Sequence, residues 1–163
     1  MAPINNIPFR GDGGFVPIGS KKFAIGLHWR TFEEEDIKID KYARNVAKDY
    51  GANLYSINRP LNNQIGFGST TVGHKSGMPV FAFQIAENIG ESFLAIFKIE
   101  ALFYIIGMTD GKVLPGTDRM IESMDSASEI FEDLRYGHHF DRLIAPSDFN
   151  IEQTKNSSIE EFI

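Results

Sequence analysis

One stretch of the sequence comes close to a phosphate-binding motif. Residues 68–76, Gly-Ser-Thr-Thr-Val-Gly-His-Lys-Ser, match G-x-x-x-x-G-K-[ST] except that His74 is inserted before Lys75. In the motif the lysine reaches the terminal phosphates and the next hydroxyl reaches magnesium. One extra residue rotates both side chains by about 100° if that turn is helical. Gly77 and Pro79 also argue against a helix beginning at Lys75. The sequence therefore favours a flexible surface loop over a nucleotide site.

The histidines do not form a metal-binding pattern. His138 and His139 are adjacent, so their side chains diverge on a strand and on a helix alike. A metal would need further ligands from His28, His74 or distant acids, and no spacing indicates them. The chain has no G-x-S-x-G motif, and its lack of cysteine excludes disulfides, Cys-based zinc sites and thiol nucleophiles. We therefore predict no catalytic residue, no metal and no cofactor.

Composition and charge narrow the remaining function classes. A chain of 163 residues with 42% hydrophobic content is long enough for one domain with a real core. The formal net charge of −6 provides no general basic field that would attract a phosphate backbone. We predict no nucleic-acid partner for this reason.

Local patterns predict a mixed sheet with helices packed on it. Apolar residues at helical spacing predict a helix over 39–50, ended by Gly51. Two aromatic and β-branched runs separated by Glu100 and Ala101 predict an antiparallel hairpin over 93–108. Ser126 and Glu129 have capping-box spacing and predict a helix over 126–136. Further strands are expected at 54–57, 64–69 and 142–145, with a helix also expected before the hairpin. The fold class that follows is α/β, in a single domain.

The two ends of the chain differ from its middle. Residues 1–20 are rich in proline and glycine, which suits an arm rather than a packed element. We expect an α/β domain over 21–150 and a polar tail over 151–163. No run of about 18 apolar residues occurs.

The segment Phe23–Phe32, FAIGLHWRTF, reads as a short apolar strand. It resembles the first strand of actin-like ATPases, in which a hydrophobic run ends on Asp-x-Gly-Thr and the following loop holds a phosphate. His28 stands where that aspartate would be, and Arg30 stands where the glycine would be. An ordinary strand end with Trp29 buried against a neighbouring helix predicts the same residues as an actin-like subdomain that has lost its nucleotide site.

A wider resemblance covers residues 23–147. The sequence Phe-Ala-Ile-Gly-Leu-His-Trp-Arg at 23–30, the paired strands over 93–108, Val-Leu-Pro-Gly at 113–116 and the helix over 126–136 are similar to the cytoplasmic N-terminal region of BfpC-like proteins. These are inner-membrane proteins of type IVb pilus biogenesis, similar to the L component of type II secretion platforms. The resemblance implies a diverged actin-like, or RNase H-like, fold.

The resemblance also implies a function and partners. The domain would be a non-enzymatic scaffold at the cytoplasmic face of the bacterial inner membrane, docking the pilus assembly ATPase and the polytopic platform protein. It would reach the membrane through a span that follows residue 163, and it could form a homodimer. The alternative is a nucleotide-binding or ATP-hydrolysing domain of actin-like ancestry.

Glu33, Glu34, Glu35 and Asp36 form the densest run of acidic residues. Acids before a helix are also common because they stabilise its N-terminus, so the run has two interpretations. If the domain docks a basic partner surface, these four residues are the candidate partner-binding site.

Overall fold

The structure is a computed structural model that describes residues 14–162. Its strands are β1 (Phe15–Ile18), β2 (Lys21–Ala24), β3 (His28–Thr31), β4 (Leu54–Ile57), β5 (Gln64–Gly68), β6 (Phe93–Ile99), β7 (Leu102–Thr109), β8 (Lys112–Val113), β9 (Arg119–Ile121) and β10 (Arg142–Ile144). Its α-helices are α1 (Ile39–Val46), α2 (Phe81–Ile89) and α3 (Met124–Gly137). Short 3-10 helices lie at Ala47–Tyr50, Thr70–Val72, Ser147–Phe149 and Ile159–Phe162.

The largest sheet has the order β10-β6-β7, and β8 and β9 both pair with β7. Strands β6 and β7 form an antiparallel hairpin in which Phe93 lies opposite Met108. Strand β10 returns parallel to β6, after α3, with Leu143 opposite Leu94. The sheet is therefore mixed, as the sequence predicts.

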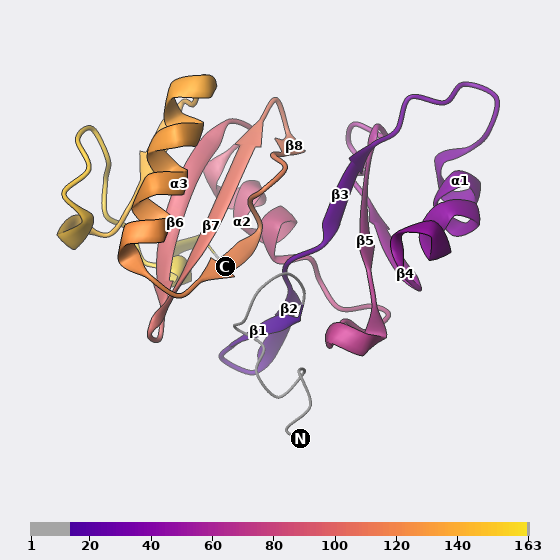
Figure 1. Cartoon of the computed structure of the whole chain (residues 1–163), viewed down its shortest axis with the longest axis horizontal. Coiled ribbons are helices and arrows are strands. Elements are labelled where there is room, and N and C mark those ends of the chain that lie inside the picture. Colours follow the sequence, from indigo (N-terminus) through magenta and orange to yellow (C-terminus); the bar gives the residue numbers. More distant parts are fainter. Residues whose placement is uncertain (1–13, 163) are drawn as a thin grey trace.

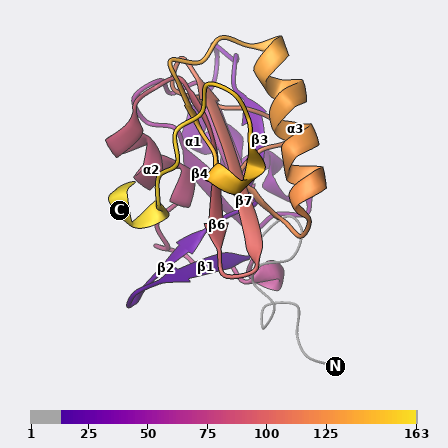
Figure 2. The same ribbon diagram turned by 90° about the vertical axis from the view of Figure 1, so that its left-hand side faces the viewer.

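Helices cover both faces of this sheet. Leu94 and Ile96 of β6 pack with Phe131 of α3, whereas Phe93 and Phe97 belong to the cluster that includes α2. Figure 2 shows β6 and β7 between α2 and α3. Because successive side chains of a strand point to opposite faces, a strand covered on both sides is apolar at almost every position.

A second sheet has the order β3-β5-β4 and is antiparallel throughout. Helix α1 packs on it through Ile39, Ala43 and the 3-10 residue Ala47, against Ile65 and Phe67 of β5. Figure 1 shows this sheet and α1 beside the larger sheet. The hairpin of β1 and β2 lies below the larger sheet in that view.

Several sequence predictions are confirmed at their own positions. The predicted helix over 39–50 is α1 and its 3-10 extension, and Gly51 ends it with a φ of 67°. The predicted hairpin is β6 and β7, and the strands expected at 54–57 and 142–145 are β4 and β10. The single α/β domain with a mixed sheet is confirmed.

The cap of α3 differs from the prediction. Ser123, not Ser126, is the N-cap, and its hydroxyl accepts a hydrogen bond from the Ser126 backbone N–H at 3.0 Å. The helix accordingly begins at Met124. Two serines at capping distance from the same helical run cannot be ranked by spacing alone.

Both ends of the described chain pack more closely than expected. Most of the predicted arm lies outside the described residues, but residues 15–18 form β1, and Val16 is buried. In the predicted polar tail, Ile159 and Phe162 are buried against the core of the larger sheet. The Phe162 ring lies 5.7 Å from that of Phe97, centroid to centroid. Polar residues flank Ile159 and Phe162 in the sequence, so the composition of this segment does not indicate that the two side chains are buried.

Candidate functional site

The glycine-bearing loop after β5 is anchored by His74. The His74 Nδ1 atom accepts a hydrogen bond from the Ser69 backbone N–H at 3.1 Å, and Nε2 lies 2.8 Å from the Ile25 carbonyl oxygen. Because that oxygen can only accept, Nε2 carries the proton. Burial lowers the pKa of His74, which favours this neutral form. The expectation of a flexible surface loop is wrong at this residue, since His74 ties β5 to the segment after β2.

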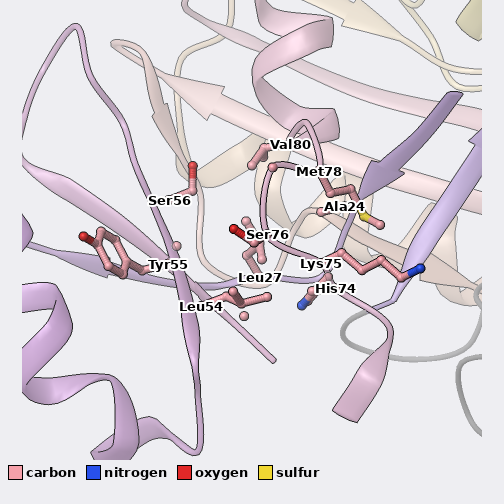
Figure 3. A pocket seen from close by; sticks show the side chains of 13 residues that line it. Ala24, Leu27, Leu54, Tyr55, Ser56, His74, Lys75, Ser76, Met78 and Val80 are labelled. Carbon is pink, nitrogen blue, oxygen red and sulfur yellow. The ribbon is translucent and has the colours of Figure 1, made fainter. Parts of the chain in front are cut away.

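The two residues that would contact a nucleotide do not converge. Lys75 and Ser76 line a cavity of about 280 Å³ that is also formed by β4, β5 and residues 77–80. Figure 3 shows the Lys75 side chain extending away from Ser76. Helix α2 begins only at Phe81, so no helix begins at Lys75, as predicted. The loop therefore lacks the helix N-terminus and the lysine–hydroxyl pair that a phosphate loop uses.

The segment Phe23–Phe32, expected to be one short strand, contains parts of two strands. Gly26, with a φ of 68°, separates β2 from β3, and these strands belong to different sheets. Trp29 of β3 is buried, and its ring packs edge-on against Phe83 of α2 with centroids 5.3 Å apart. The expectation that Trp29 is buried against a helix is confirmed.

His28 and Arg30 lie on the opposite side of β3 from Trp29. The His28 ring centroid is 5.1 Å from that of Tyr50, and the Arg30 guanidinium lies 5.3 Å from the same ring centroid. Both residues are exposed. Both side chains therefore pack over the Tyr50 ring, at the end of the 3-10 extension of α1.

A buried carboxylate, Asp118, joins the two sheets. Its Oδ2 atom accepts hydrogen bonds from the Leu27 backbone N–H at 3.2 Å and from the Trp29 indole N–H at 3.0 Å. Its Oδ1 atom accepts one from the Tyr104 hydroxyl at 2.5 Å. The side chain is fully buried, and burial, only partly offset by these hydrogen bonds, raises the pKa of Asp118 to about 7.

The geometry of Asp118 suits a structural role. Its backbone has a φ of 62°, and its N–H and carbonyl bond to Ile105 and Gly26. With an exposed fraction of 0%, the carboxylate has no contact with solvent and cannot exchange protons with a substrate there. Sequence reasoning missed this residue, because an aspartate after Pro115-Gly116 has the signature of an ordinary turn.

The acidic run lies in the loop between β3 and α1. Glu33, Glu34, Glu35 and Asp36 are all exposed, and none forms an ion pair with another residue in the range 14–162. Helix α1 begins at Ile39, so these carboxylates precede its first turn, where Asp40 supplies the acidic group. The structure brings the four predicted residues together on one accessible loop.

In the described part of the chain, the remaining candidate ligands do not form a metal site. His138 and His139 are exposed after α3. Among residues 14–162, no group of three or more His, Cys, Asp or Glu side chains is arranged to hold a metal ion. None of the helices in the described part combines the length and apolarity that crossing a membrane requires.

Comparison with known proteins relates the chain to a solved structure. Neither a protein-family model nor a curated protein matches the chain. The crystal structure of the cytoplasmic domain of BfpC matches with a TM-score of 0.74 and 29% sequence identity, and the match covers 93% of each chain. The chain is similar to the cytoplasmic domain of BfpC. The resemblance drawn from the sequence is thus confirmed.

The match with BfpC extends beyond the segment that suggested it. The residues that carry the resemblance in the sequence span 23–147, whereas the structural match covers 93% of this chain. The likeness in fold to the BfpC cytoplasmic domain therefore covers more of the chain than residues 23–147.

Proposed function

We propose that this chain is a non-enzymatic scaffold domain of the type IVb pilus assembly machinery, which docks the assembly ATPase and the polytopic platform protein. The observation that carries the proposal is the match with the cytoplasmic domain of BfpC over 93% of both chains. We further propose that the domain lies at the cytoplasmic face of the bacterial inner membrane and is attached through a span that follows residue 163.

The chemistry of the described residues supports docking rather than catalysis. His74 is committed to two hydrogen bonds inside the glycine-bearing loop. Asp118 is enclosed and bonded to three donors. The carboxylates of residues 33–36 are accessible and adjacent to one another. Such a surface contributes to association rate and specificity, whereas a buried apolar contact contributes most of the affinity.

We also propose that the larger sheet is a diverged actin-like, or RNase H-like, unit. It contains a hairpin (β6, β7), a third antiparallel strand (β9), a helix (α3) and a strand parallel to the first (β10), in the spatial order β10-β6-β7-β9. In this topology the first strand is β6, and the turn that follows it consists of Glu100 and Ala101. That turn is short and contains no glycine, which supports the absence of a phosphate site.

The docking role of the acidic run is tested by charge reversal. The four-residue variant Glu33→Lys, Glu34→Lys, Glu35→Lys and Asp36→Lys is compared with the wild type for binding to the purified ATPase and platform protein at low and high salt. The matched control reverses four other exposed acids, Glu129, Asp133, Glu160 and Glu161, and so makes the same change in net charge.

We expect the first variant, and not the control, to slow association at low salt, with the difference shrinking at high salt. Equal rates for the wild type and the first variant at both salts would remove residues 33–36 from the interface. Failure of both purified proteins to bind the wild type would refute the scaffold function itself.

The nucleotide-binding alternative predicts that Mg-ATP at 100 times its dissociation constant raises the free energy of unfolding by about 2.7 kcal/mol, and we expect no such increase.

A further inference from the structure

A groove lies between helix α2 and the turns that follow β4 and β7. Its walls are the turn after β4, the last turns of α2 and the turn between β7 and β8, and its volume is about 340 Å³. Ile57, Leu61, Phe83, Ala86 and Met108 give it a largely apolar lining. We call this feature the α2 groove. Clefts of this size and character commonly bind ligands or peptide side chains.

The walls of the α2 groove are held in place by buried amide groups. The Asn58 side-chain amide donates to the Gly111 carbonyl at 2.7 Å, and the Gln64 amide donates to the Val113 carbonyl at 2.7 Å. The Val113 N–H donates to Gln64 Oε1 at 3.0 Å. These bonds connect the β4–β5 turn and the start of β5 to the β7–β8 turn and β8, so the groove is formed before any partner arrives. A preformed site loses less conformational entropy on binding.

The rim of the α2 groove is negatively charged. Glu87 and Glu91 are exposed, and neither forms an ion pair with another residue of the described chain. Arg59 also lines the groove, but its guanidinium makes two hydrogen bonds to the Asp40 carboxylate, at 3.0 and 3.1 Å. That pairing neutralises the positive charge on the rim. An anionic ligand such as a nucleotide is therefore disfavoured, and a cationic partner is favoured.

One wall residue is unusually exposed for an apolar side chain. Leu61 is 38% exposed and lies against Gly111, where a Cβ atom would come within 3.4 Å of it. An exposed leucine above an apolar floor provides the contact that a bulky side chain from another protein would complete.

We infer that the α2 groove binds a segment of a partner protein that carries a bulky apolar side chain next to a lysine or arginine. The apolar side chain occupies the space between Leu61 and Phe83, and the basic residue lies beside Glu87 and Glu91. This inference rests on the proposed docking function and specifies a site for it that is separate from the acidic run at 33–36.

Three variants test the groove with the purified ATPase and platform protein as probes. Leu61→Ser removes the apolar wall at an exposed position, and Glu87→Lys with Glu91→Lys reverses the rim. Glu129→Lys with Asp133→Lys is the matched control, because it reverses two exposed acids at the same spacing on α3. Circular dichroism of each variant checks that the fold is retained.

We expect each groove variant to weaken binding of one of the two proteins by about 10-fold or more, and the control to leave that binding within about two-fold. In a parallel measurement a photoreactive amino acid replaces Leu61, and the crosslinked partner segment is expected to contain an apolar residue beside Lys or Arg.

Other results would overturn the inference. If both groove variants bind the two proteins as tightly as the wild type does, the α2 groove is not the binding site, and the scaffold function is unaffected. A wild-type dimer that Leu61→Ser converts to a monomer would assign the groove to a second copy of this chain instead. A crosslink to an acidic or wholly polar segment would refute the proposed chemistry. If neither protein binds the wild type, the scaffold function falls, and this inference falls with it.

Discussion

Replacing Asp118 with asparagine should change how the stability of the domain depends on pH. Asparagine tolerates the positive φ of 62° at this position. Its Oδ1 atom can accept the two bonds from Leu27 and Trp29, which reach a single oxygen in the native protein. Its NH₂ group then faces the Tyr104 hydroxyl, which can act as an acceptor. The variant therefore keeps the local contacts and removes only the titration.

The sign of the effect follows from the direction of the shift. Burial raises the pKa of Asp118 from its usual 3.8 to about 7, so the folded protein holds this proton where the unfolded chain releases it. The contribution of this proton to the free energy of unfolding is fully present below pH 3.8 and is lost as the pH rises towards 7. Roughly three pH units at ~1.4 kcal/mol each give a change of roughly 4 kcal/mol.

Urea unfolding of the wild type and Asp118→Asn between pH 4 and pH 8 measures this change. The free energy of unfolding of the wild type minus that of the variant should fall by roughly 4 kcal/mol up to pH 7 and then level off. Contributions from His74 and the surface carboxylates cancel in this difference. Asp110→Asn is the matched control, because Asp110 also has a positive φ, 51°, but is exposed. A difference that stays constant or grows with pH would refute the reasoning.

Four further substitutions test three particular contacts by urea unfolding at constant pH. Ser123→Ala should destabilise the domain by about 1 kcal/mol through loss of the α3 cap, and Ser126→Ala should destabilise it clearly less. If Ser126→Ala were the more destabilising of the two, Ser126 would be the N-cap, as the sequence predicted. Gly66→Ala should cost about 1–3 kcal/mol, because a Cβ atom there would lie 2.8 Å from the Trp29 ring; an unchanged midpoint would contradict that contact. Phe162→Ala should cost about 3–5 kcal/mol as for a core aromatic, whereas a loss under 1 kcal/mol would show that the C-terminal segment is not part of the core.

The elements that the sequence predicted well are those whose signals are local. The β6–β7 hairpin is specified by two apolar runs and a two-residue turn, and α1 by apolar residues at helical spacing that end at Gly51. Each pattern lies within a window of about 11–18 residues, so a short stretch of sequence contains all the information it needs. The same local reading identified residues 33–36 as an exposed acidic group.

The roles of Trp29, His74 and Asp118 were decided by the tertiary structure. Asp118 meets Trp29 from 89 positions away, and His74 meets Ile25 from 49 positions away. In the sequence the first is a turn residue and the second is an insertion in a near-motif. Only burial and long-range hydrogen bonds distinguish these structural residues from functional ones, because a polar group removed from water must find its partner wherever the fold places it.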